Sequence, residues 1–210
     1  QHPCFCKDVS EYYGDITRAL EEIDTDVLLA GHSTGGLICS LYTHEGELRD
    51  RVRALWLSSP FFEFNASASR LLQLRIARDL AFFFPYMNNP RSVAPAYVKS
   101  LHKNWDGEWD FDLALKPLLG FPAYFGWVRA IFEAHAKVHA GLSLGCPVLS
   151  MHSDEADIVL NWTQVSRWSH TLGSNVSVRQ FPGGLHDLVL SPAEIRDEVF
   201  RQLFAWASTQ

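Results

Sequence analysis

The chain has 210 residues and a formal net charge of −6 at neutral pH. An acidic balance argues against binding to nucleic acid, which requires a basic surface, and a hydrophobic fraction of 47% is typical of a folded domain with a sizeable core. No apolar stretch approaches the roughly 20 residues that a membrane-spanning helix needs.

The first segment of the chain predicts a unit of two parallel strands. Residues 8–23 carry apolar side chains at helical spacing. Residues 26–30 and 52–57 are short apolar runs, which are typical of buried parallel strands. A helix over residues 37–42 lies between the two runs. This order of strand, helix and strand with short links indicates a parallel sheet covered by helices.

The middle segment, residues 61–144, lacks the strand pattern. Helices are predicted over residues 71–84, 93–102 and 123–139, and five prolines lie among them. We therefore expect a helical insertion within the α/β core.

Strands return after the insertion. Residues 147–152 and 176–181 predict two further buried strands, and residues 162–172 predict a helix between them. Ser191 is expected to cap the last helix, with Pro192 at its first helical position.

Together these elements predict one fold class and three segments. The fold class is α/β, with a mostly parallel sheet flanked by helices. Residues 1–60 are expected to form the first part of the core and residues 145–210 the second part. Residues 61–144 are expected to form a helical cap.

Gly31-His32-Ser33-Thr34-Gly35 fits the G-x-S-x-G pattern of a nucleophile elbow. The pattern lies between a predicted strand and a predicted helix, which is the context that this turn requires. We expect glycine at positions 31 and 35 because a side chain at either would collide with the neighbouring strand and helix. Ser33 is the predicted nucleophile, and the Thr34 N–H is the predicted oxyanion donor.

His186 is the predicted general base, because a serine nucleophile needs a base and His186 lies between the last strand and the last helix. His32 is expected to point elsewhere, and His152 lies at the strand end that should carry the acid. His135 and His139 are four residues apart and could bind a metal, but they lack a surrounding HExxH pattern. We expect these two on a solvated helix face.

Three carboxylates compete for the role of the acid that orients His186. Asp154, Glu155 and Asp157 all follow the same predicted strand. Asp157 is favoured because an apolar pair follows it after one residue, whereas Asp154 suits a solvated turn. Asp187 is adjacent to the base and would be awkward as its partner.

Motifs in the expected order carry a family resemblance over nearly the whole chain. They are Gly-His-Ser-Thr-Gly-Gly from Gly31, Asp157-Ile-Val-Leu, and Gly183-Gly-Leu-His-Asp-Leu-Val-Leu-Ser-Pro. With them the chain resembles the α/β-hydrolases grouped with lysophospholipases, monoacylglycerol lipases and serine aminopeptidase (S33) hydrolases. The resemblance implies acyl transfer through an acyl-enzyme at Ser33, with His186 moving the proton and Asp157 holding His186. We expect neither a cofactor nor a metal.

Aromatic residues in the insertion favour an ester with an apolar, medium or long acyl group as the small-molecule substrate. The candidates for lining an acyl pocket are Phe82, Phe83, Phe84, Tyr86, Trp105, Trp109, Phe121, Tyr124, Phe125 and Trp127. Two alternatives remain open. One is an aminopeptidase-type amide hydrolase, in which Glu108, Asp110 and Asp112 could hold a free amino group. The other is an inactive hydrolase-derived fragment or binding module.

The sequence begins with Gln1 rather than Met. Residues 1–7 cannot supply the first strands of the family or the loop that carries the second oxyanion donor, so we expect a family member that lacks its N-terminal strands. Losing one oxyanion donor costs about 10²–10³ in rate. We therefore expect these residues alone to be poorly stable and weakly active.

The cysteines show no spacing typical of a zinc site. They are Cys4, Cys6, Cys39 and Cys146. Cys39 and Cys146 are expected in buried positions as small apolar side chains. These cysteine positions favour reduced thiols and a cytoplasmic location.

Overall fold

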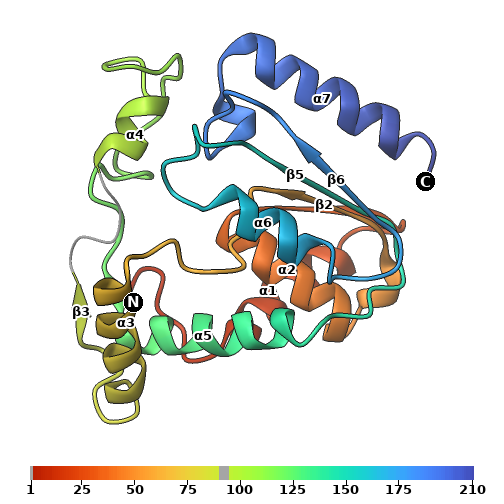
Figure 1. Ribbon diagram of the computed structural model, residues 1–210. Helices are drawn as coiled ribbons and strands as arrows, with labels where there is room; N and C mark the ends of the chain where they lie inside the picture. Colours follow the sequence, from red (N-terminus) through yellow and green to blue (C-terminus); the bar gives the residue numbers. More distant parts are fainter. Residues whose placement is uncertain (1, 90–94) are drawn as a thin grey trace. The chain divides into compact units, whose positions relative to one another are not determined.

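The computed structural model, shown in Figure 1, describes residues 2–89 and 95–210. These residues fall into two compact units. One unit contains residues 2–9 and the described part of 64–134, and the other contains residues 10–63 and 135–210. The compact insertion is thus shorter than the predicted segment 61–144, and residues 2–9 group with it. Its role as a cap stays a prediction.

The second unit is built on a parallel sheet. Its strands are β1 (Val27–His32), β2 (Val52–Ser58), β5 (Val148–His152) and β6 (Val176–Gln180), in the order β1-β2-β5-β6. All the pairings between these strands are parallel. The α/β fold class and the four strands predicted from short apolar runs are confirmed.

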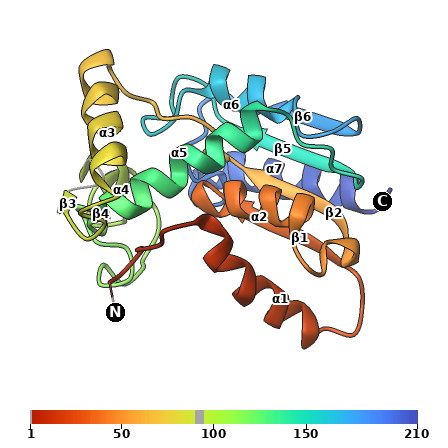
Figure 2. The same cartoon turned by 90° about the horizontal axis from the view of Figure 1, so that it is seen from below.

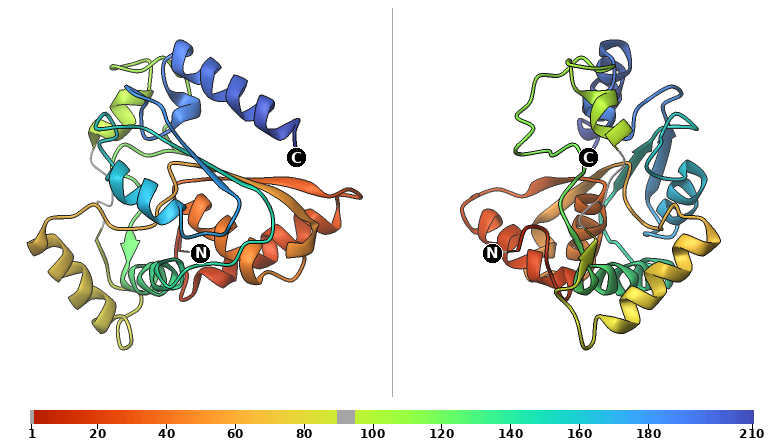
Figure 3. Two further views of the ribbon diagram at one scale, coloured as in Figure 1. Left: turned by 45° about the vertical axis from the view of Figure 1, so that its right-hand side comes forward. Right: turned by 90° about the vertical axis from the view of Figure 1, so that its left-hand side faces the viewer.

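Helices cover both faces of this sheet. They are α1 (Tyr13–Glu21), α2 (Thr34–Glu45), α6 (Trp162–Ser169) and α7 (Ala193–Ala207), with the short 3₁₀ turns η1 (Val9–Tyr12), η2 (Arg49–Arg51) and η3 (Leu188–Leu190). Figure 2 shows α2 and α6 in front of the strands and α7 behind them. The views in Figure 3 agree that α7 lies on the opposite side of the sheet from α2 and α6. Every residue of β5 is buried, as expected for a parallel strand covered on both faces.

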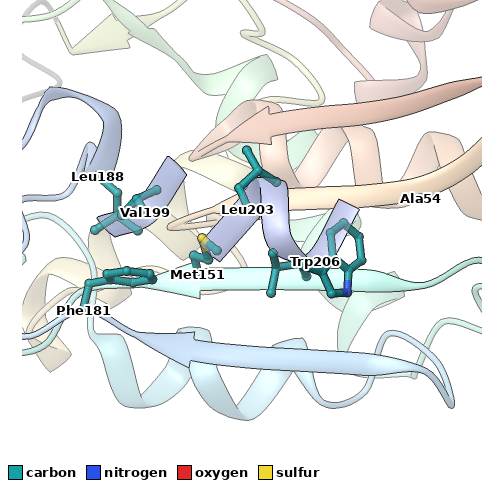
Figure 4. Packing of buried hydrophobic residues seen from close by; sticks show 8 residues of the cluster. Ala54, Met151, Phe181, Leu188, Val199, Leu203 and Trp206 are labelled. Carbon is teal, nitrogen blue, oxygen red and sulfur yellow. The ribbon is translucent and has the colours of Figure 1, made fainter. Parts of the chain in front are cut away.

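The face under α7 forms the larger described core. Val199, Leu203 and Trp206 of α7 pack over Met151 of β5, and Phe181 closes the end of the cluster (Figure 4). These side chains recur at three- and four-residue spacing on α7, so a single stripe of the helix reaches the sheet.

The opposite face is covered by α1 and α2. Leu20 of α1, Tyr42 of α2 and Val52 of β2 form one buried cluster. The Tyr42 hydroxyl accepts a hydrogen bond from the Leu48 N–H at 3.3 Å and lies 2.9 Å from the Thr17 hydroxyl. The buried phenol is therefore paired, as a polar group in a core must be.

The insertion unit is mostly helical, as predicted. It contains α3 (Ala68–Leu80), α4 (Pro95–Leu101) and the greater part of α5 (Phe125–His139), whose last five residues belong to the sheet unit. The predicted helix over 93–102 begins with two residues that lie outside the described residues. The structure adds an antiparallel pair, β3 (Asn88–Asn89) with β4 (Ala123–Tyr124), which the sequence did not predict. Strands of two residues are too short to show a periodic pattern.

The predicted cap of the last helix is wrong. α7 begins at Ala193, so Pro192 occupies the capping position and makes no side-chain cap. The Ser191 hydroxyl accepts instead from the Leu185 N–H at 2.9 Å and donates to the Asp187 carbonyl at 3.1 Å. Ser191 thus holds the loop before the helix rather than the helix itself.

Within the described part of the chain, no helix combines the length and the hydropathy needed to cross a bilayer.

Leu203→Ala and Phe204→Ala form a matched pair on α7. Leu203 is buried in the core and Phe204 is 65% exposed. We expect Leu203→Ala to lower the free energy of unfolding by about 2–4 kcal/mol, because it removes core methyl groups and leaves a cavity. Phe204→Ala should stay within about 0.5 kcal/mol of the parent protein. Urea unfolding followed by circular dichroism measures both, and equal losses would contradict the packing of α7.

Candidate active site

Ser33 occupies a strained turn between β1 and α2. Its backbone angles are φ 53° and ψ −120°, a left-handed conformation that costs about 1–3 kcal/mol outside glycine. Backbone hydrogen bonds hold the turn: the Ser33 N–H donates to the Ser58 carbonyl at 3.0 Å. The Ser33 carbonyl accepts from the Leu37 N–H at 3.2 Å and from the Phe61 N–H at 2.9 Å. A strained turn therefore lies between β1 and α2, where the G-x-S-x-G pattern predicted one.

The steric reason for the elbow glycines differs from our expectation at one position. A Cβ on Gly31 would lie 2.6 Å from the Gly35 carbonyl oxygen, so Gly31 is required as predicted. A Cβ on Gly35 would meet nothing within 4 Å, and the prediction of a collision there is wrong. The second close approach falls on Gly36, where a Cβ would lie 2.9 Å from the Pro60 Cβ.

Thr34 is the first residue of α2. The N–H groups of a first helical turn have no partner inside the helix, and the helix dipole favours negative charge at this end. The Thr34 N–H thus follows the Ser33 side chain directly at a helix N-terminus. Its service as an oxyanion donor stays a prediction.

Ser33, His186 and Asp157 form a continuous hydrogen-bonded chain. His186 Nε2 lies 3.0 Å from the Ser33 Oγ, and His186 Nδ1 lies 2.9 Å from Asp157 Oδ2. A carboxylate only accepts, so Nδ1 carries the proton and Nε2 accepts from the serine hydroxyl. The His186 and Asp157 side chains are each 2% exposed. This order of groups can withdraw a proton from Ser33.

The second oxygen of Asp157 is also engaged. Oδ1 accepts from the Val159 N–H at 2.8 Å and from the Leu160 N–H at 2.9 Å. Burial alone would raise the pKa of the Asp157 carboxyl, but the hydrogen bond and charge of His186 and these two N–H groups outweigh it, and the pKa is lowered. Asp157 therefore remains ionised opposite His186.

The rival carboxylates, Asp154 and Glu155, lie elsewhere in the loop. Asp154 accepts from the Ala156 N–H at 3.0 Å and, with both oxygens, from the Gly183 N–H at 3.1 Å. These N–H groups lower the pKa of Asp154, and they tie the strand end to the loop that leads to His186. Glu155 is exposed.

Two serines whose role here the sequence did not predict fix the His186 loop. The Ser153 hydroxyl donates to the Gly184 carbonyl, and the Ser191 hydroxyl accepts from the Leu185 N–H. Both serines are fully buried. Ser191 was visible in the sequence but was assigned to a helix cap, whereas no pattern around Ser153 distinguishes it.

His32, which was not favoured as the base, lies beside His186. The two ring centroids are 4.9 Å apart, and His32 Nε2 lies 3.4 Å from the His186 carbonyl oxygen. His32 Nδ1 is 3.9 Å from Asp187 Oδ2. Asp187 in turn accepts from the Leu190 N–H at 3.3 Å, which caps η3.

His135 and His139 do not lie on a solvated helix face. His135 is 3% exposed, and its Nε2 is 2.9 Å from the Phe61 carbonyl oxygen. His139 is half-buried, and its Nε2 is 2.8 Å from the Phe62 carbonyl oxygen. Burial lowers the pKa of His135 to about 3. Among the described residues, no group of three or more His, Cys, Asp or Glu side chains is placed to hold a metal ion.

The aromatic candidates of the insertion differ in exposure. Phe82 and Phe83 are each 72% exposed, whereas Tyr124 is buried and stacks edge-on against Phe5 at 5.5 Å. Of the candidate amine anchors, Glu108 is exposed, and the other two already have partners. Asp110 pairs with Lys103, and Asp112 accepts from the Ala114 N–H at 2.8 Å.

Three features together define the α/β-hydrolase fold. They are the parallel sheet, the strained serine between a strand and a helix, and the histidine loop after the last strand. Solved structures with the same fold are similar to this chain. The chain is similar to the monoacylglycerol lipase of Paleococcus ferrophilus, with a TM-score of 0.74 and 22% identity, over 95% of this chain and 74% of that one. It is also similar to a soluble variant of monoglyceride lipase from Saccharomyces cerevisiae, with a TM-score of 0.73 and 17% identity, over 94% and 69% of the two chains.

The family follows from the sequence match. The model of the family described as serine aminopeptidase, S33, matches residues 2–193, and the chain belongs to this family. The resemblance inferred from the motifs is thereby confirmed. None of the curated proteins that were compared matches the chain.

Gly31→Ala and Gly35→Ala should have opposite effects. A methyl group at Gly31 would press on the Gly35 carbonyl, so we expect Gly31→Ala to destabilise the fold and to suppress reaction at Ser33. Gly35→Ala meets open space in a helix, where alanine is favoured over glycine by about 0.5–1 kcal/mol. Urea unfolding and labelling by a fluorophosphonate probe measure the two effects. A tolerated alanine at Gly31 would contradict this geometry.

Proposed function

We propose that the protein is a serine hydrolase that cleaves carboxylic esters, with Ser33 as nucleophile, His186 as general base and Asp157 as the orienting acid. The observation that carries this proposal is the hydrogen-bonded chain from the Ser33 hydroxyl through His186 to Asp157. Membership of a hydrolase family supports it independently.

The proposed reaction passes through an acyl-enzyme. The Ser33 Oγ attacks the ester carbonyl carbon while its proton moves to His186 Nε2. The negative charge that develops on the carbonyl oxygen is stabilised by the Thr34 N–H at the N-terminus of α2. When the ester C–O bond breaks, the leaving alkoxide takes the proton from His186, and the acyl group remains on Ser33.

Water completes the cycle. It attacks the acyl carbon and gives a proton to His186, and the departing Ser33 oxygen then takes that proton back as the acid is released. Asp157 holds the Nδ1–H tautomer of His186 throughout and stabilises the ring when it is charged. No residue needs to supply redox chemistry in these steps.

We infer an ester with an apolar acyl group as the substrate. Two similar solved structures are named as a monoacylglycerol lipase and a monoglyceride lipase. The aromatic side chains concentrated in the insertion suit an apolar acyl chain.

The family description favours a second candidate, cleavage of an amide beside a free amino terminus. That reaction requires a carboxylate to hold the substrate ammonium group. Of the candidates in the insertion, Asp110 already pairs with Lys103, and Asp112 accepts from a backbone N–H. Two of the three candidate carboxylates are thus already engaged, which favours the ester over the amide.

Ser33→Ala should abolish labelling by a fluorophosphonate probe, because the probe bonds covalently to an activated serine.

Asp157→Asn should lower kcat on the order of 10⁴-fold, since the asparagine favours the wrong tautomer of His186. Glu155→Gln is the matched control on the same loop and should leave kcat unchanged. A folded parent protein that never labels would instead support a binding module.

Ester chain length should set the rate of hydrolysis. With p-nitrophenyl esters we expect kcat/KM to rise from acetyl to medium or long acyl groups, because an apolar chain contributes about 0.8 kcal/mol per buried methylene group. An aminoacyl p-nitroanilide tests the amide alternative. A preference for acetyl, or faster cleavage of the anilide, would count against the proposed substrate.

A further inference from the structure

The backbone directly after β2 supports the nucleophile. The Ser33 N–H donates to the Ser58 carbonyl at 3.0 Å, and the Phe61 N–H donates to the Ser33 carbonyl at 2.9 Å. Ser33 has a positive φ, and a strained residue keeps such a conformation only where its surroundings hold it. The position of residues 58–61 therefore bears on the position of the Ser33 side chain.

Partners at successive residues fix this segment in turn. His135 Nε2 bonds to the Phe61 carbonyl at 2.9 Å, and His139 Nε2 bonds to the Phe62 carbonyl at 2.8 Å. The next residue, Glu63, accepts from Trp168 Nε1 at 2.6 Å. Phe61 thus donates through its N–H to Ser33 and accepts through its carbonyl from His135.

The bond from His135 has a defined chemistry. A carbonyl oxygen only accepts, so His135 Nε2 carries a proton. The ring is 3% exposed and meets the Phe61 ring edge-on at 4.8 Å, and the ring of His139 stacks 6.0 Å away. Removing this buried donor would cost the Phe61 carbonyl a hydrogen bond.

We propose that His135 is a positioning residue for Ser33, acting through the Phe61 backbone that it holds. The inference rests on the proposed role of Ser33 as nucleophile. When the donor is lost, the buried Phe61 carbonyl loses the hydrogen bond from His135, and the segment shifts. The Phe61 N–H moves with it, and the Ser33 Oγ loses its alignment with His186 Nε2. A misplacement of about 1 Å at a reacting atom can cost 10²-fold in rate.

The test compares His135→Leu, which removes the donor, with His135→Gln, whose side-chain amide restores one. We expect His135→Leu to lower kcat for a p-nitrophenyl ester by about tenfold or more, with KM unchanged, and His135→Gln to recover to within about threefold. Fluorophosphonate labelling of Ser33 should slow in parallel. Tyr42→Phe is the control, because it removes a buried hydroxyl at the far end of α2 and should reduce stability alone.

The outcomes separate this inference from the proposed function. If the parent protein labels at Ser33 and His135→Leu labels equally fast, the positioning role is overturned while the nucleophile stands. If the parent protein does not label, the proposed function fails first. His135→Asn, too short to reach Phe61, gives a polar second variant with the same expected loss where the leucine does not fold.

The parent protein offers a further check by pH. Because the pKa of His135 is lowered to about 3, its ring stays neutral at pH 5 while the unfolded chain takes up a proton below its usual pKa of 6.5. Its contribution to stability is therefore full above pH 6.5 and falls as the pH drops toward 3. Nitrogen NMR should show a protonated Nε2 and an unprotonated Nδ1 between pH 5 and pH 8. A ring whose Nε2 carries no proton in this range would overturn the proposed bond.

Discussion

The structure of the site depends on one close approach, where β1 turns back into α2. Gly31 allows the Gly35 carbonyl to come within a distance that any side chain would block. The turn forces Ser33 into a left-handed conformation, and hydrogen bonds from the ends of neighbouring segments keep it there. These segments lie close together because the carboxyl ends of the strands in a parallel sheet meet at one edge.

The partners of Ser33 come from loops at that same edge, and the loops are rigid for local reasons. Asp157 uses one oxygen for backbone N–H groups and the other for His186, so its own loop fixes the direction of the carboxylate. Ser153 and Ser191 hold the loop that carries His186. Buried polar groups of this kind cost stability when they are unpaired, so each bond also selects the loop conformation.

The sequence predicted the features that show a periodic pattern of apolar residues or a short motif of fixed spacing. The strands appeared as short apolar runs, and the strained turn at Ser33 was predicted because Ser33 lies between one of them and a helix. What it missed depended on contacts distant in the chain. The i, i+4 spacing of His135 and His139 does not tell which face of a helix is buried, and Ser191 offers the same hydroxyl to a helix cap or to a loop. The glycine requirement at Gly36 arises from Pro60, which only the folded chain brings near.

The two ends of the insertion are bonded to each other within the sheet unit. Phe61 and Phe62 leave the sheet beside His135 and His139, where the chain returns. A segment whose ends are fastened in this way can lengthen, shorten or be exchanged between relatives without new demands on the strands. Changes of length within the insertion can therefore leave the junction and the sheet in place.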